Sequence, residues 1–135
     1  MALFSGLSKY QSTGLLILRT GIGIMMIIHG YPKMMGGPDL WAKIGSAMPI
    51  KGAPGLAVFW GFMAAFAEAV GGLLFILGFL FRPACFLLLV TMGVAAHKHF
   101  TDGDGLQGAG HALELAVVFL AMFIIGPGKY SVDKR

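Results

Sequence analysis

Charge is scarce in this sequence. Its 135 residues include ten Lys and Arg and six Asp and Glu, so charged residues make up 12% of the chain and hydrophobic ones 57%. Soluble domains carry about 25% charged residues. The apolar residues come in blocks rather than in amphipathic stripes, so a soluble fold would expose large apolar patches. The composition excludes an ordinary soluble globule and indicates a protein whose solvent is the lipid bilayer.

Cysteine and runs of basic residues are also lacking. The one cysteine, Cys85, excludes an internal disulfide and any Cys-x-x-Cys chemistry. The formal net charge of +4 is spread along the chain, so we expect no nucleic acid partner. No Ala-x-Ala-like cleavage site follows the first apolar run, which we therefore expect to be a retained span rather than a signal peptide.

Four segments have the length and apolarity of membrane-spanning helices, which need roughly 20 residues. They lie at about residues 10–29, 55–80, 83–100 and 109–125. The turn between the second and third spans is short, so these two helices must be antiparallel neighbours. The sequence predicts an all-α fold, with residues 1–135 forming one membrane domain built as an antiparallel four-helix bundle.

The segment between the first two spans is the longest connection and has Gly and Pro at both ends. We expect Pro32 to end the first helix. Asp39 is placed to cap a short helix whose shared face carries Leu40, Trp41, Ile44 and Met48. The pattern predicts a short interfacial helix, with an ordered loop packed over the bundle as the alternative.

Basic residues near the span ends bear on orientation. One side holds Lys9, Arg82, Lys129, Lys134 and Arg135, and the other holds Lys33, Lys43, Lys51 and Lys98. The positive-inside rule favours both termini in the cytoplasm, by a margin of one charge.

Two charged residues, Arg19 and Glu68, lie inside predicted spans. A charge at the bilayer centre costs about 2.5–3.5 kcal/mol on insertion scales, so such residues usually pair inside the bundle. Glycines and alanines around Glu68 and after Arg19 would let the first two spans approach closely. We therefore predict an Arg19–Glu68 ion pair between them.

More ionisable residues gather at the span ends opposite the termini, where alternating helix directions bring them to one side of the membrane. We predict a polar pocket there, with Glu68 at its floor. The pocket candidates are Arg19, His29, Glu68, His97, His111 and Glu114, and the rim candidates are Lys33, Lys98 and His99. The histidine spacing matches no established metal motif, so we expect neither a metal nor haem.

Three stretches, LRTGIGIMMIIHGYPKMMGGP, AEAVGGLLFILGFLFRPA and HALELAVVFLAMFIIGPGKYSVD, together resemble the DoxX family of small four-span bacterial membrane proteins. The resemblance covers about residues 15–133. It implies a bacterial inner (plasma) membrane location and an association with redox and oxidative-stress functions, including a subunit of a thiosulfate:quinone oxidoreductase. Its catalytic residues are not established. Arg19, His29, Glu68, His97 and Glu114 stand at polar positions expected of such a bundle.

Three functions remain open. In the leading one, the chain is a membrane subunit, as in a quinone-linked oxidoreductase: His97 or His29 donates to a quinone carbonyl, and Glu68 and Glu114 relay protons. Arg19 would set the ionisation of the two glutamates, and an external partner would supply electrons. The second is a non-catalytic scaffold that recruits a soluble redox or sulfur-transfer enzyme. The third is a small-solute or proton transporter, whose path a homo-oligomer would widen.

Overall fold

Long helices dominate the structure, a computed structural model that describes residues 3–50, 52–53 and 55–133. Four helical segments are long and apolar enough to cross a membrane, which confirms the predicted all-α membrane fold. A short helix stands in the first loop, also as predicted. The elements are η1 (Ser5–Tyr10), α1 (Gln11–Met34), α2 (Pro38–Gly45), α3 (Leu56–Leu77), α4 (Phe81–Thr101) and α5 (Gly105–Ile125).

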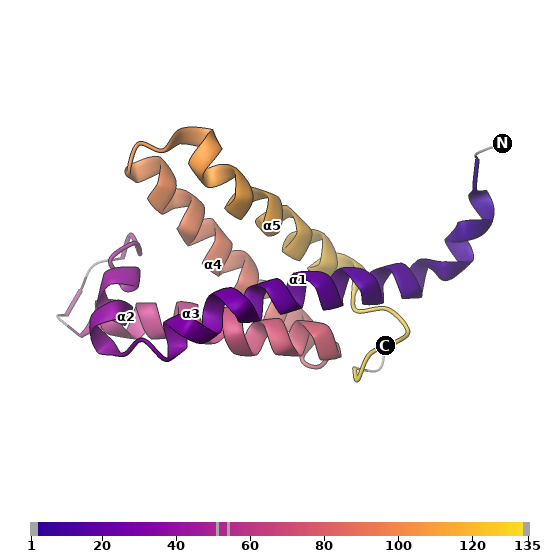
Figure 1. The fold of residues 1–135 in the computed structure, drawn as a ribbon, viewed down its shortest axis with the longest axis horizontal. Coiled ribbons are helices and arrows are strands. Elements are labelled where there is room, and N and C mark those ends of the chain that lie inside the picture. Colours follow the sequence, from indigo (N-terminus) through magenta and orange to yellow (C-terminus); the bar gives the residue numbers. More distant parts are fainter. Residues whose placement is uncertain (1–2, 51, 54, 134–135) are drawn as a thin grey trace.

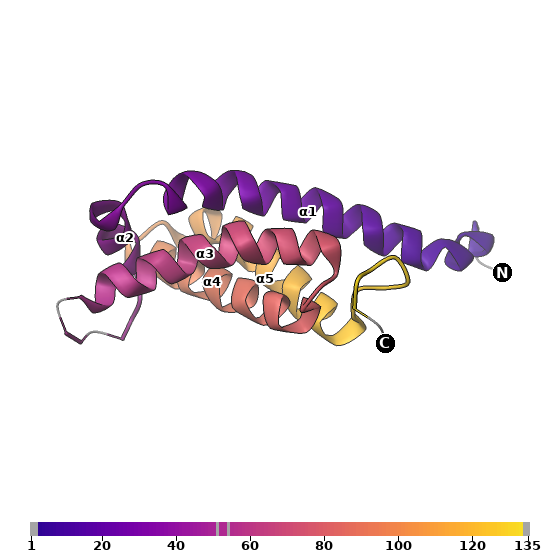
Figure 2. The ribbon, with the colours of Figure 1, turned by 90° about the horizontal axis from the view of Figure 1, so that it is seen from below.

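The long helices form two antiparallel pairs. Helix α1 packs along α3, helix α4 packs along α5, and contacts between α3 and α4 join the pairs. The α4–α5 pair runs at an angle to α1 and α3, and the two pairs diverge towards the end that carries α2 (Figure 1). Seen from below, α1 and α3 lie side by side with α2 at one end, and both ends of the chain lie at the other (Figure 2).

Aromatic packing holds the two pairs together near the chain ends. Phe75 of α3 stacks on Phe81 of α4 and meets Phe119 of α5 edge-on, with ring centroids 5.2 and 5.3 Å apart. All three rings are buried, and such pairs add to the stabilisation from buried apolar area. The bundle is therefore closed at this end, and its helices separate towards the other.

The C-terminal segment is fastened to the turn between α3 and α4. Gly78, at φ 67°, takes the left-handed conformation that ends α3. The carboxylate of Asp133 accepts hydrogen bonds from the backbone N–H groups of Leu80 (3.0 Å) and Phe81 (2.8 Å). Asp133 thus satisfies donors at the start of α4 that have no partner within the helix.

Two local predictions for the first loop were wrong. Helix α1 continues through Pro32 to Met34. The proline removes one N–H donor from the helix, and only two helical residues follow it, so little helix depends on the lost hydrogen bond. Asp39 does not cap α2: Gly37 is the N-cap and Pro38 follows it. Proline suits the first helical position, and Asp39 then lies in the first turn near the positive end of the helix dipole.

Candidate functional site

A cavity of about 380 Å³ lies between α3 and α4, on the side where the two helix pairs diverge. Its wall is mostly apolar. The end of α2 and the residues that follow it cover part of the cavity. Phe86 and Val90 of α4 line it and are themselves exposed. The polar side chains in its lining are Lys33, Trp60, Glu68, Thr91, Lys98, His99 and Asp102.

An ion pair stands in the wall of this cavity, halfway along α3. The Nζ atom of Lys33 lies 3.1 and 3.0 Å from the two carboxylate oxygens of Glu68. Glu68 is buried and Lys33 is about one-third exposed. A buried carboxylate needs a partner, and Lys33 supplies it from the last turn of α1.

Two close helix contacts position this pair. Gly30 of α1 lies against Glu68: a Cβ atom added there would be 2.5 Å from the Cβ of Glu68 and from the backbone nitrogen of Ala69. On the far side, the indole N–H of Trp41 in α2 donates to the carbonyl oxygen of Lys33 at 2.8 Å. The backbone that carries Lys33 is thus held from both sides.

Charged residues from the end of α4 and the turn after it form the rim. Lys98 pairs with Asp102 at 3.0 Å, and the Nδ1 atom of His99 lies 2.8 Å from a carboxylate oxygen of Asp104. Both pairs are exposed, so each contributes little to stability. Because the two pairs lie at the cavity mouth, a molecule that enters from this end of the bundle would contact them.

Trp60 adds a hydrogen-bond donor with no acceptor. Its Nε1 atom is buried and has no hydrogen-bond partner in the described part of the chain, and its side chain lines the cavity. Buried donors are nearly always paired. Neither Trp60 nor Asp102 was predicted as a site residue from the sequence. For Asp102, the sequence does carry a signal, since it lies four residues after Lys98.

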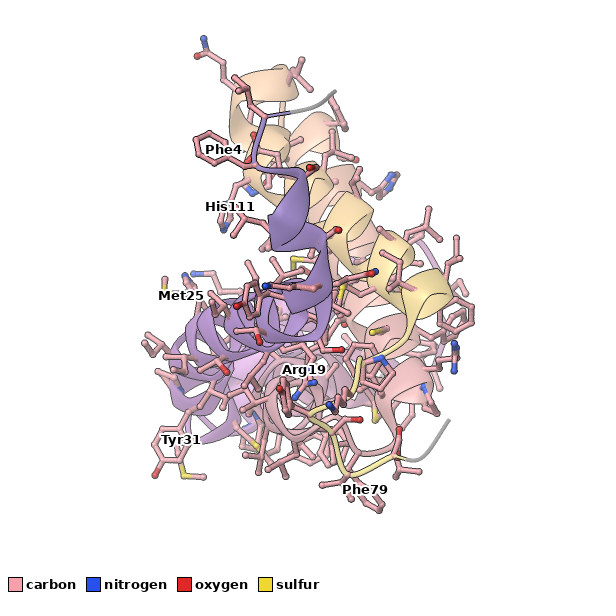
Figure 3. All side chains as sticks on the ribbon, turned by 90° about the vertical axis from the view of Figure 1, so that its right-hand side faces the viewer. Phe4, Arg19, Met25, Tyr31, Phe79 and His111 are labelled. Carbon is pink, nitrogen blue, oxygen red and sulfur yellow. The ribbon has the colours of Figure 1, made fainter. Side chains whose placement is uncertain are left out.

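The predicted Arg19–Glu68 pair is wrong. Arg19 is buried and donates to three backbone carbonyl oxygens, those of Pro127 (2.6 Å), Ile76 (2.8 Å) and Tyr130 (2.7 Å). It lies beside the C-terminal segment in the middle of the molecule (Figure 3). Ile76 is eight residues from Glu68, or about 12 Å along α3. The carbonyls at the end of α3 lack helical partners and carry the negative end of the dipole, so they substitute for a carboxylate.

The other predicted pocket residues lie outside the cavity. His29, His97, His111 and Glu114 are all exposed, and His29 has its Nδ1 atom 2.7 Å from the carbonyl oxygen of Met25, one turn earlier on α1. His111 projects from the periphery of α5 (Figure 3). Of the predicted rim residues, Lys33, Lys98 and His99 do line the cavity, with Glu68. Within the described ranges, no three His, Cys, Asp or Glu residues are grouped to hold a metal ion.

Comparison with known proteins gives a consistent family assignment. The model of the DoxX family matches residues 14–101. The inner membrane protein YphA of Escherichia coli K12 is 32% identical over 132 residues, covering 90% of this chain and 89% of its own. The inner membrane protein YqjF of the same organism is 30% identical over 131 residues, covering 95% of each chain. An uncharacterized protein of Haemophilus influenzae is 31% identical, covering 97% and 96%. No solved structure gives a significant match.

Proposed function

The chain belongs to the DoxX family of membrane proteins, and we propose that it is a small inner-membrane subunit that supports redox or oxidative-stress chemistry by binding a quinone headgroup between α3 and α4. The observation that carries this proposal is the Lys33–Glu68 pair in an otherwise apolar cavity. An apolar cavity with a few convergent polar groups is the usual form of a small-molecule site.

The polar groups suit a flat ring that bears carbonyl oxygens. The ammonium group of Lys33 and the indole N–H of Trp60 are donors on the cavity wall. Glu68 beside Lys33 and His99 at the mouth can exchange protons with a bound ring. An apolar tail would pass between Phe86 and Val90, which are 55% and 41% exposed, towards lipid.

The chemistry requires an external partner. Conversion of a quinone to a quinol takes up two electrons and two protons, and a chain with one cysteine has no dithiol pair that could supply the electrons. We place the electron donor outside this chain, as a soluble enzyme at the cavity end of the bundle. The protein's own residues would bind the ring, exclude water from it and hold protons at Glu68 and His99.

Binding of a short-chain quinone to the purified protein in detergent tests the proposal, with quenching of tryptophan fluorescence as the signal. His99→Ala and His97→Ala form a matched pair, because His99 lines the cavity and His97, two residues earlier on α4, is exposed outside it. We expect saturable binding that weakens about tenfold with His99→Ala or Glu68→Gln and is unchanged with His97→Ala. Equal effects of the two histidine changes, or no saturable binding, would refute the site.

A scaffold function is the second proposal, and the charged rim favours it. Lys98, Asp102, His99 and Asp104 form two exposed pairs at the tip of the α4–α5 hairpin, a position from which a soluble redox or sulfur-transfer enzyme can be bound. Reversing the charges of Lys98 and Asp102 would abolish recruitment of that enzyme, and retained recruitment would contradict a scaffold function of the rim.

A further inference from the structure

The outer face of α5 carries a stripe of polar residues inside an apolar span. Gln107, His111 and Glu114 follow the four- and three-residue spacing that places side chains on one side of a helix, and all three are exposed. Glu114 is the tenth of the 21 residues of α5, a helix apolar enough to cross a membrane. The opposite face of α5 packs against the core through Ala109, Ala112, Phe119 and Met122.

This face requires a cover that one copy of the chain does not supply. Ionisable residues within membrane spans nearly always face the protein interior or pair with one another. Neither His111 nor Glu114 has a hydrogen bond or ion pair to any residue of the described ranges. Left against lipid, a carboxyl group this far along the span is costly.

We propose that this outer face of α5, defined by Gln107, Gly110, His111, Glu114, Val117 and Ala121, is the interface with a second copy of the chain. Copies inserted in the same orientation are related by a two-fold axis along the bilayer normal, so their α5 helices run in the same direction and equal residues have equal depth. Glu114 of each copy then faces His111 of the other across an offset of three residues, about 4.5 Å, which the two side chains can bridge.

Charge complementarity selects a second copy over a different protein. The acceptor Glu114 and the donor His111 are on the same face of the same helix, so the face is complementary to itself and forms two equivalent contacts. Gly110 adds room for the approach, because a Cβ atom placed there would meet nothing within 4 Å. The proposal does not depend on the cavity or on its ligand.

Cysteine crosslinking in native membranes tests the interface without altering its charges. In a Cys85→Ala background, Val117→Cys is placed on the outer face of α5 and Ile17→Cys on α1; these side chains are 66% and 69% exposed in the single chain. We expect oxidation to convert Val117→Cys to a disulfide-linked homodimer and to leave Ile17→Cys monomeric. Equal crosslinking of the two variants, a monomer in both, or a crosslink to another protein would overturn the proposal.

An exchange of the two polar residues tests the contact itself. His111→Glu and Glu114→His each place like groups across the interface and disrupt both equivalent contacts, so each should weaken the dimer about tenfold, or about threefold for each polar contact between membrane helices. The double variant restores Glu opposite His and should regain the affinity of the original chain, measured by energy transfer between labelled copies in liposomes. If the double variant lost as much dimer affinity as the two single variants combined, the proposal would be overturned.

Discussion

Gly30 of α1 lies directly on the backbone of α3 at Glu68, so that a Cβ atom at position 30 would be only 2.5 Å from the Cβ of Glu68. This approach fixes the distance between α1 and α3 where Lys33 reaches the carboxylate. The ion pair of the cavity therefore depends on a residue that has no side chain.

Gly30→Ala is expected to destabilise the fold and to displace Lys33 from Glu68. The added methyl group meets backbone atoms that cannot move aside, and overpacking of this kind costs about 1–3 kcal/mol. Gly21→Ala is the matched control on the same helix, since its Cβ would meet nothing within 4 Å. Thermal denaturation in detergent should give a lower midpoint for Gly30→Ala only; a drop of equal size in Gly21→Ala would contradict the role of the close contact.

Lys33 and Glu68 should be energetically coupled. Lys33→Met leaves a buried carboxylate without its partner, whereas Lys33→Met combined with Glu68→Gln removes the unpaired charge as well. A double-mutant cycle on unfolding free energies should give a coupling of about 1–3 kcal/mol.

The exposed pair Lys98–Asp102 is the control for this cycle. Both of its side chains are more than two-fifths exposed, and exposed pairs are worth at most about 1 kcal/mol. If the coupling energy of Lys33 and Glu68 were no larger than that of Lys98 and Asp102, burial would not strengthen the Lys33–Glu68 ion pair.

Apolar runs and turn residues were enough to predict the membrane-spanning helices, because these signals are local. The partners of Arg19 and Glu68 were not predictable in this way. Both residues were recognised as needing partners, yet the carbonyls of Pro127 and Tyr130 belong to a tail whose path depends on the whole fold. A backbone carbonyl is present at every residue, so no sequence pattern marks those that bind Arg19.

The histidines illustrate a second limit. Their positions near helix ends place them on one side of the membrane, but a helix turns by about 100° per residue, and position along the chain does not say which face meets a neighbour. His97 and His99 are two residues apart, and only His99 lines the cavity. The rotation of α4 about its own axis decides which of the two histidines faces the cavity.

Both termini should lie in the cytoplasm, with the cavity end of the bundle on the opposite side of the membrane. The described ends of the chain lie together at one end of the molecule (Figure 1), and the positive-inside rule favours that end. In a Cys85→Ala background, Thr101→Cys at the cavity end and Val132→Cys at the other end report the two sides. A membrane-impermeant thiol reagent should label only Thr101→Cys in intact cells, and the reverse pattern would invert the assignment.

Arg19 should fix the C-terminal segment, because its guanidinium group donates to carbonyls from two separate parts of the fold, Ile76 at the end of α3 and Pro127 and Tyr130 in the tail. Lysine carries the same charge on one nitrogen and lacks the fork of donors that reaches three acceptors. Arg19→Lys should therefore lower stability by at least about 2 kcal/mol and expose the tail to proteolysis.

Arg82→Lys is the comparison for Arg19→Lys, since Arg82 is exposed and donates to the single carbonyl of Phe123 at 3.0 Å. Limited proteolysis with mass analysis should give tail cleavage in Arg19→Lys at protease concentrations that leave Arg82→Lys intact. Asp133→Asn, which weakens the second attachment at the start of α4, should add to the effect of Arg19→Lys, because the two contacts hold the same segment at different residues. If Arg19→Lys alone left cleavage unchanged while Asp133→Asn released the tail, the cap on α4 rather than Arg19 would be what holds it.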